Sequence, residues 1–456
     1  MVHLLSFFRV LFLLIFFNWT AQASEDLKIQ LQVEKFKLEN GLTVLLHRDP
    51  SIPLVSYHTW YRVGSRDERP GITGSAHMLE HMMFKGAEKY SNKEFDRILH
   101  SNGIVNNAFT SFDYTGFYQT LPKDKLELMM DLEKDRMSAL LLRAEDLLSE
   151  KEVVAEERRW RVDNNPQSLL REQAMEALYP GHPYRWPVIG YMKDIANFDV
   201  KTLRRFYDEY YGPNNAILVI AGDIDIAATK ALVEKYYGSL KVKPVPRSSA
   251  SKVKPLREKR VITLKKDVQV PSLMVSYQSV PDQHPDSYAL EILAQILGNG
   301  ASSRLSKDLV HRKQVATATG ATQWSLRDTG LWGVFVSLKP NAKDKTVLEA
   351  VDREIFRLRH QLVSERELNR AKNQFMTAFV DGISTIDSKA RALASAEIMT
   401  GDYKNLFGDL EKYQRLTAED IRRVAQKYLN PNARIEAWLK PATTTAKSSR
   451  QQEIQL

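Results

Sequence analysis

The feature that most constrains the fold of this chain is an internal repeat, whose two copies are related by one constant offset in numbering. Residues 199–214 have the period of an amphipathic helix, end in a Pro-Asn stop and lead into an apolar stretch at residues 216–221. Residues 417–432 and 434–439 repeat the same helix, stop and strand. The residues that recur at this offset are Arg204 and Arg422, Arg205 and Arg423, Tyr210 and Tyr428, Pro213 and Pro431, and Asn214 and Asn432. The repeat predicts two homologous domains.

The starts of the two copies match more loosely. Residues 52–57 and 270–277 each read as a strand that runs toward a helix. Between the copies, residues 241–255 are rich in Pro, Ser and Lys, which is typical of a linker. The predicted order is a leader at residues 1–23, a first domain at 24–240, a linker at 241–260, a second domain at 261–441 and a disordered polar tail at 442–456.

Residues 1–23 have the composition of a secretory signal peptide. Arg9 precedes an apolar core at residues 10–17, and Ala21-Gln22-Ala23 is a small-x-small cleavage site. No later stretch is apolar over the length of a membrane span, so we expect no integral membrane segment after the leader is removed. We therefore expect an exported protein, periplasmic in a Gram-negative bacterium and otherwise secreted. The chain has no cysteine, which excludes thiolate metal ligands and cysteine nucleophiles.

The chain is basic, with 65 Lys and Arg against 56 Asp and Glu. A basic balance can indicate nucleic-acid binding, but no recognised binding motif accompanies it. The excess charge is spread along the chain, with local density in residues 241–260. A solvated basic surface is the favoured interpretation, and we expect no nucleic-acid partner.

Residues 77–81 read His-Met-Leu-Glu-His, which is the strongest chemical signal in the chain. In a helix, His77 and His81 are four residues apart, so both imidazoles project from one face. Glu80 lies on the flank of the same arc, where it can reach a water held between the histidines. Two neutral nitrogens beside a carboxylate are typical of a catalytic zinc site, and the order His-x-x-Glu-His is a known catalytic motif.

Two histidines leave a zinc ion short of a protein ligand, and a downstream carboxylate is needed. The predicted helix at residues 145–161 offers Glu150, Glu152, Glu156 and Glu157. Glu150 and Glu157 are seven apart and share a face, so one can bind the metal while the other orients a histidine. Spacing alone does not choose among these glutamates.

The second copy of the repeat lacks the same set of residues. Alignment of the two copies puts Glu291, Ala294 and Gln295 where the first copy has its two histidines and its glutamate. These residues cannot form an equivalent site. We therefore expect one zinc ion per chain, held by the first domain.

A strand is predicted after the motif. Residues 106–115 mix β-branched, aromatic and small residues, as a sheet strand does. With its edge toward the zinc, this strand can accept an extended peptide as an added strand, bound through main-chain hydrogen bonds. A plain structural strand is the alternative.

These segments together resemble the pitrilysin/insulinase family of zinc peptidases, which includes the mitochondrial processing peptidase and many bacterial relatives. The resemblance rests on the motif at residues 77–81, the Asn-Ala-Phe-Thr segment that starts at Asn107, and residues 40–46, 182–190 and 298–305. It covers nearly the whole chain after the leader, which is similar to bacterial relatives of the processing peptidase β subunit. It implies an α+β fold of two homologous domains, each a mainly antiparallel sheet packed with helices.

The resemblance also implies roles for single residues. It makes Glu157 the third zinc ligand beside the two histidines, Glu150 its supporting carboxylate and Glu80 the general base. It makes Asn107 and Ala108 contacts to the substrate backbone. The implied activity is that of a zinc endopeptidase acting on extended peptides or unfolded proteins.

One departure from the family pattern concerns the second domain. Members that complete the site alone carry an Arg and a Tyr there. Arg304 matches the Arg, whereas Thr317 stands where a Tyr is frequent. Some bacterial relatives divide these residues between two chains, so we expect a dimer in which a homologous chain supplies the Arg/Tyr pair. Arg304 can equally be structural, pairing at a helix start.

A non-catalytic scaffold or assembly subunit of the same family is the alternative function. Such chains usually have a broken metal motif, whereas all four chemical residues are present here. The substrate, the cleaved bonds and the partner are not identified by the sequence.

Overall fold

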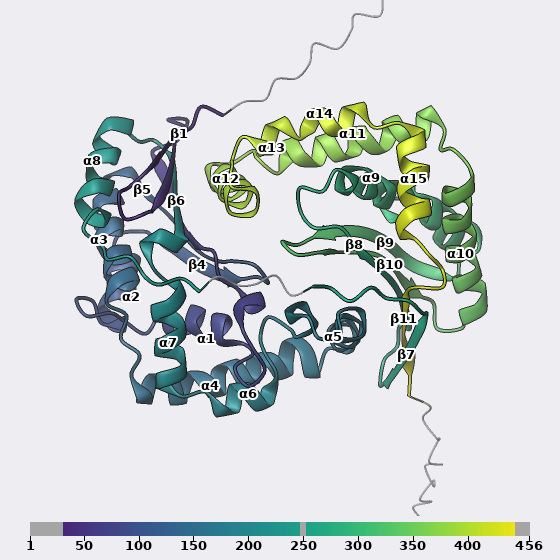
Figure 1. Ribbon diagram of the computed structural model, residues 1–456, viewed down its shortest axis with the longest axis horizontal. Helices are drawn as coiled ribbons and strands as arrows, with labels where there is room; N and C mark the ends of the chain where they lie inside the picture. The colour runs from purple at the N-terminus through teal and green to yellow at the C-terminus, as the bar shows by residue number, and fades with distance from the viewer. Residues whose placement is uncertain (1–30, 247–251, 443–456) are drawn as a thin grey trace, which may run out of the picture. The chain divides into compact units, whose positions relative to one another are not determined.

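Two β-sheets organise the part of the chain that the computed structural model describes, residues 31–246 and 252–442 (Figure 1). The first sheet has the order β1-β2-β6-β3-β5-β4, in which β2 and β6 run parallel and the other neighbours antiparallel. Its strands are β1 (Glu34–Lys37), β2 (Thr43–Arg48), β3 (Leu54–Tyr61), β4 (Val105–Thr110), β5 (Thr115–Pro122) and β6 (Ala216–Gly222). β4 therefore lies at an edge of this sheet.

The second sheet repeats this pattern without the first strand. Its order is β7-β11-β8-β10-β9, again with one parallel pair, β7 and β11. β3 begins at Leu54 and β8 at Ser272, which preserves the offset seen between the two copies of the repeat. The strands are β7 (Arg260–Lys266), β8 (Ser272–Ser279), β9 (Ala316–Ser325), β10 (Gly330–Leu338) and β11 (Ile435–Pro441). The predicted fold, α+β with two mainly antiparallel sheets related by duplication, is confirmed.

The helices of the first half follow the sequence pattern. α7 buries Leu203, Phe206 and Tyr207 in the core, and Asp199 caps it by accepting a hydrogen bond from the N–H of Thr202. The helices are α1 (Ser75–Met82), α2 (Asn92–Ser101), α3 (Leu126–Ser138), α4 (Ala144–Arg158), α5 (Pro166–Leu178), α6 (Met192–Asn197), α7 (Val200–Tyr210) and α8 (Ile226–Tyr237). Short 3₁₀ turns cover Ser65–Asp67, Lys123–Lys125, Pro183–Arg185 and Pro213–Asn215, and a π-helix covers Arg159–Asp163.

The second half repeats the capped helix that precedes the last strand. α15 buries Ile421 and Val424, and Thr417 caps it by accepting a hydrogen bond from the N–H of Asp420. The helices are α9 (Asp286–Gly298), α10 (Asp344–His360), α11 (Glu365–Asp381), α12 (Ile386–Thr400), α13 (Asn405–Gly408), α14 (Leu410–Arg415) and α15 (Ala418–Tyr428), with a π-helix at Ser306–Arg312. The predicted correspondence of the two helix-to-strand segments is therefore present in the structure.

Each half supplies one helix to the sheet of the other half. α5 packs against β7, β8 and β11, and α12 packs against β3 and β6. On the α5 side, Leu170 and Leu178 are buried in one cluster with Leu331, Ile435 and Leu439. Burying one Leu side chain contributes about 2 kcal/mol, so this exchange ties the two halves together.

The predicted strand at residues 106–115 is shorter in the structure. β4 ends at Thr110, and a turn follows in which the N–H of Ser111 donates to the carbonyl of Tyr114. The turn lets β5 run back antiparallel to β4, with Ala108 opposite Phe117. The prediction is wrong for the last residues because a hairpin reverses the chain there.

Several predicted segments lie wholly or partly outside the described residues. The leader at residues 1–23 lies wholly outside them, and of the predicted tail only residue 442 is described. The described residues between α8 and β7 form no helix or strand. The boundaries of the leader, linker, domains and tail stay predictions.

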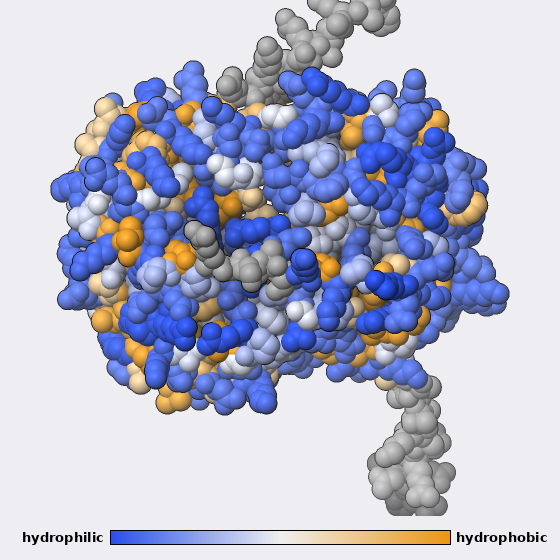
Figure 2. Space-filling view, in the orientation of Figure 1, coloured by the Kyte–Doolittle hydropathy of each residue, from blue (hydrophilic) through white to orange (hydrophobic). Residues whose placement is uncertain are grey.

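The face of the molecule in Figure 2 is mostly hydrophilic, with hydrophobic residues scattered over it. The large apolar side chains are mostly in the cores of the two halves. Among residues 31–246 and 252–442, no helix has the length and apolar character needed to cross a membrane.

Candidate metal centre

α1 carries the two histidines of the motif on the face opposite its packed side. Leu79 and Met82 are fully buried in the core of the first half, so the helical period turns His77 and His81 toward a cavity. The imidazole centroids of His77 and His81 lie 4.7 Å apart. The helix thus holds both imidazoles side by side, as the four-residue spacing predicts.

A carboxylate from outside the helix fixes the start of α1. Glu68 accepts hydrogen bonds from the N–H groups of Gly74 at 2.8 Å and Ala76 at 2.9 Å. A negative charge at a helix N-terminus is favourable because the first N–H groups have no partner within the helix. Glu68 is buried, and burial raises its pKa well above the usual range, while the hydrogen bonds from Ala76 and Gly74 favour its charged form and oppose that rise. The helix that carries the histidines is therefore anchored at its first turn.

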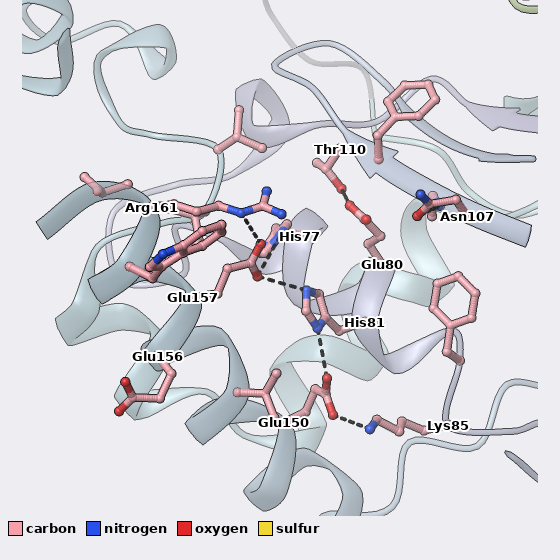
Figure 3. Close-up of a pocket in the computed structure, with 18 residues that line it drawn as sticks. His77, Glu80, His81, Lys85, Asn107, Thr110, Glu150, Glu156, Glu157 and Arg161 are labelled. Carbon is pink, nitrogen blue, oxygen red and sulfur yellow. Dashed lines mark hydrogen bonds and ion pairs between the residues drawn. The ribbon is translucent and has the colours of Figure 1, made fainter. Parts of the chain in front are cut away.

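α4 faces α1 and presents two of the four candidate glutamates. Glu150 and Glu157 point toward the histidines, whereas Glu152 and Glu156 are exposed (Figure 3). Glu150 and Glu157 are two helical turns apart, so they share a face. The structure brings together His77, His81, Glu150 and Glu157, which the sequence places in two separate segments.

Three side chains converge as a potential metal-binding group. Glu157 Oε2 lies 3.3 Å from His81 Nε2 and 3.6 Å from His77 Nε2. The ligand atoms of these three residues lie within 4.8 Å of one another. Glu157 Oε2 is buried and has no hydrogen-bond partner among the described residues. Two imidazole nitrogens and one carboxylate oxygen are a donor set that zinc prefers, so these residues fit a zinc ion.

Glu150 sets the orientation of one of these imidazoles. Its Oε1 accepts a hydrogen bond from His81 Nδ1 at 2.9 Å. With the proton on Nδ1, the Nε2 of a neutral His81 presents its lone pair toward Glu157. The position of Glu150 agrees with a supporting role next to the histidine.

The pKa values of His77, His81, Glu150 and Glu157 are shifted from their usual ranges. Burial, reinforced by His81, lowers the pKa of His77 to about 4. Burial also disfavours the charged form of His81, but the hydrogen bond to Glu150 and the nearby carboxylate of Glu157 outweigh it and raise the pKa of His81 to about 9. Burial opposes ionisation of both glutamates, yet their contacts with His81 hold the pKa of each below its usual value.

Glu80 lies at the other side of the same cavity, next to β4. Burial raises the pKa of Glu80, while a hydrogen bond donated by the Thr110 hydroxyl opposes that rise. This bond joins α1 to the edge strand of the sheet. A carboxyl group with a raised pKa beside a metal-binding group is suited to proton transfer.

The cavity has a volume of about 940 Å³. One wall is β4, from Asn107 to Thr110, and the other is α4 with the π-helix that follows it. β4 pairs only with β5, so its outer edge has no strand partner among the described residues. The N–H of Ala108 bonds the side-chain oxygen of Asn107 at 2.8 Å instead of a neighbouring strand. Asn107 and Ala108 therefore line the cavity at this unpaired edge, and their contacts to substrate stay a prediction.

Arg304 is not brought to this cavity. It donates two hydrogen bonds to Glu367, at 2.7 and 2.9 Å, next to the π-helix that begins at Ser306. It lines a separate cavity of about 450 Å³ in the second half. Thr317 is exposed on β9. The structural reading of Arg304, as a pairing residue at a helix start, accounts for its contacts, and its substrate role stays a prediction.

Sequence reasoning missed four residues that complete the surroundings of the site: Glu68, Lys85, Thr110 and Arg161. Lys85 and Arg161 follow His81 and Glu157 by four residues, a spacing that could have indicated them. Glu68 and Thr110 reach the motif helix from outside it, so no local spacing signals them.

The repeated α+β fold and the His, His, Glu group define the class as a two-domain protein with a metal-binding group in its first half. Family models agree with this. The model described as "Insulinase (Peptidase family M16)" matches residues 43–190. The model described as "Peptidase M16 inactive domain" matches residues 197–375.

Relatives match over almost the full length. "Zinc protease PqqE" of Helicobacter pylori is 32% identical over 90% of this chain and 93% of its own. "Uncharacterized zinc protease YmxG" of Bacillus subtilis is 27% identical over 87% of this chain and 95% of its own. A crystal structure of a protease from Helicobacter pylori has a TM-score of 0.86 at 30% identity, and covers 90% of this chain and 100% of that one. The chain belongs to the insulinase family of peptidases, family M16.

Proposed function

We propose that this protein is a zinc-dependent endopeptidase that cleaves extended peptides or unfolded proteins. The convergence of His77, His81 and Glu157, with Glu80 in the same cavity, is the observation that carries the proposal. Relatives named as zinc proteases support the same class. The alternative, a non-catalytic scaffold subunit, is less favoured because the metal-binding group and Glu80 are all present in this chain.

His77, His81 and Glu157 would hold one zinc ion. Bound zinc supplies Lewis-acid chemistry, which polarises water and a substrate carbonyl at neutral pH. Glu150 keeps the His81 imidazole turned so that Nε2 faces the ligand group. The pKa shifts of these four residues are compatible with zinc binding. A bound metal ion would replace the proton that His81 otherwise carries.

Glu80 is proposed as the general base. Its carboxylate accepts the proton of the attacking water and then returns it to the leaving amine as the peptide bond breaks. Thr110 donates to one of its oxygens, which fixes the carboxylate in the cavity. The burial that raises the pKa of Glu80 makes it a better proton acceptor than an exposed glutamate.

The free edge of β4 is proposed as the binding site for the substrate backbone. A peptide that adds as a strand beside Asn107 and Ala108 would lie in the cavity that also contains the metal-binding group. Main-chain hydrogen bonds do not depend on side chains, so this mode suits many sequences. It requires an extended backbone, which favours unfolded substrates.

A partner chain forms part of the proposal. Arg304 is paired with Glu367, and Thr317 has no phenol group, so the second half does not supply an Arg/Tyr pair to the cavity. We therefore propose that this chain is the metal-bearing subunit of a heterodimer. Full activity of the purified chain by itself would contradict the need for a partner without affecting the peptidase assignment.

The function is tested by incubating the purified protein with a mixture of unstructured peptides, with and without candidate homologous chains. We expect cleavage that is lost, by about a hundredfold or more, in Glu80→Gln. Equal cleavage by Glu80→Gln would contradict the assigned base. The absence of cleavage under every condition, with zinc bound, would instead favour the scaffold function.

A further inference from the structure

We propose that Arg161 and Lys85 are positioning residues of the metal centre. Each holds the outer oxygen of one carboxylate on α4, so that the other oxygen faces a histidine. The inference rests on the proposed zinc site and deepens it. It concerns how the ligand geometry is built, which the donor set alone does not explain.

Arg161 acts on Glu157. Its Nε lies 3.0 Å from Glu157 Oε1, and Oε2 of the same carboxylate faces His77 and His81 (Figure 3). A free carboxylate can rotate and offer either oxygen or both. With Oε1 bound to a guanidinium, one oxygen remains for a metal ion, so Glu157 is set to bind through a single oxygen.

The local backbone contributes to this contact. α4 ends at Arg158 and a π-helix follows from Arg159 to Asp163. Such single-turn insertions change the direction of side chains and occur frequently at functional sites. Arg161 lies in this segment, four residues after Glu157, and lines the cavity.

Lys85 acts on Glu150 in the same way. Its ammonium group forms an ion pair with Glu150 Oε2, while Glu150 Oε1 accepts the hydrogen bond from His81 Nδ1. Lys85 follows the end of α1, the helix that carries His81. The two carboxylates of α4 therefore share one arrangement, in which a cation holds one oxygen and a histidine contacts the other.

The negative charge of the cavity is a second reason to assign positioning roles to Arg161 and Lys85. Glu80, Glu150 and Glu157 line one cavity, and the side chains of Glu150 and Glu157 are only 6% and 16% exposed. Carboxylates gathered in a partly buried site repel one another. Arg161 and Lys85 place a positive charge against each α4 glutamate and offset this repulsion.

An ordinary surface ion pair on the same helix provides the contrast. Arg159 pairs with Glu156, whose side chain is 71% exposed, whereas the Glu157 side chain is 16% exposed; the side chains of Arg159 and Arg161 are themselves 49% and 62% exposed. Exposed pairs of this kind contribute little, because water competes for both charges. Arg159 is therefore the matched control for Arg161.

The test measures zinc affinity of the full chain by competition with a chromophoric chelator. Arg161→Gln and Lys85→Met are expected to bind zinc about 10- to 100-fold more weakly. Arg159→Gln is expected to match the unaltered protein. The conservative variants Arg161→Lys and Lys85→Arg are expected to regain most of the affinity, which a purely structural defect would not show. The thermal midpoint of each metal-free variant is recorded alongside.

Two results would overturn the positioning roles, and a third, distinguishable from them, would overturn the proposed function instead. Unchanged zinc affinity in Arg161→Gln and Lys85→Met, with zinc bound by the unaltered protein, would contradict the positioning roles alone. An equal loss in Arg159→Gln would do the same, since the effect would then be one of general charge. Failure of the unaltered protein to bind zinc would contradict the proposed function itself.

Discussion

The hydroxyl of Thr110 on β4 donates a hydrogen bond to the carboxylate of Glu80 on α1. The proposed general base is therefore fixed by the strand that is proposed to bind substrate. A peptide added to β4 would come next to a base whose orientation that strand already determines. In the proposed mechanism, Thr110 would therefore couple the position of the substrate to proton transfer by Glu80.

Thr110→Val should lower turnover without removing zinc. The variant keeps the β-branched shape but loses the donor, so the Glu80 carboxylate can rotate away from the attacking water. The loss of one hydrogen bond to a charged group predicts a decrease in kcat of about tenfold or more. Thr110→Ser keeps a hydroxyl and should retain most activity. Equal rates for the Val and Ser variants would show that the bond has no catalytic role.

The edge of β4 gives a prediction about substrate binding. Ala108→Pro removes the N–H that points away from β5, where proline is tolerated because no ladder bond is lost. We expect KM for an unstructured peptide to rise about fivefold, with zinc content unchanged. Ala108→Val, which keeps the N–H, is the control. A KM that follows side-chain size rather than the N–H would contradict strand addition.

Two glycines with similar backbone angles test how tightly the start of α1 is held. Gly190 has φ of 85°, and a Cβ there would lie 2.3 Å from the carbonyl oxygen of Thr73. Gly181 has φ of 81°, with no atom within 4 Å of such a Cβ. Gly190→Ala should therefore cost about 2 kcal/mol or more in unfolding free energy and weaken zinc binding, because residue 73 precedes the ligand helix. Gly181→Ala should cost about 1 kcal/mol. Similar losses in both variants would show that the close approach is unimportant.

An ion pair between the two halves predicts a dependence of stability on pH. Burial opposes ionisation of Asp328, but contacts with His182 and Arg66 outweigh it and lower the pKa of Asp328 to about 2. Arg66 donates to both oxygens of Asp328, at 2.5 and 2.8 Å. A lowered folded-state pKa means that this stabilisation is complete above the unfolded value near 4 and is lost as the pH falls toward 2.

The size of this effect follows from the shift. A difference of about 2 pKa units corresponds to about 2 to 3 kcal/mol at neutral pH. Chemical unfolding between pH 2 and pH 5 should show this loss in the unaltered protein, and a flatter profile in Asp328→Asn. Parallel profiles for the two proteins would contradict the assignment.

Much of the fold could be predicted because its signals are local or repeated. The constant offset between the copies relates β3 to β8, and the capped helices before β6 and β11 have the same apolar period. What could not be predicted is the exchange of α5 and α12 between the halves. That exchange depends on which sheet the apolar face of each helix packs against. The sequence of a single segment does not determine this pairing.

The candidate site, like the fold, could be predicted only where its signals are local. Helical spacing put His77 beside His81, and Glu150 on the face of Glu157, and the structure shows both arrangements. The support from Glu68 and Thr110 depends on tertiary packing, because each reaches α1 from outside the motif. Arg304 shows the opposite case, in which a family pattern suggested a contact that the described residues do not make.

The central claim is that His77, His81 and Glu157 hold one zinc ion for a reaction in which Glu80 acts only as the base. Elemental analysis of the purified full chain and its variants tests it most directly. We predict one zinc per chain in the unaltered protein and in Glu80→Gln, and a large loss of zinc in His77→Ala, His81→Ala and Glu157→Ala. Full zinc content in the three ligand variants, or loss of zinc in Glu80→Gln, would contradict the account.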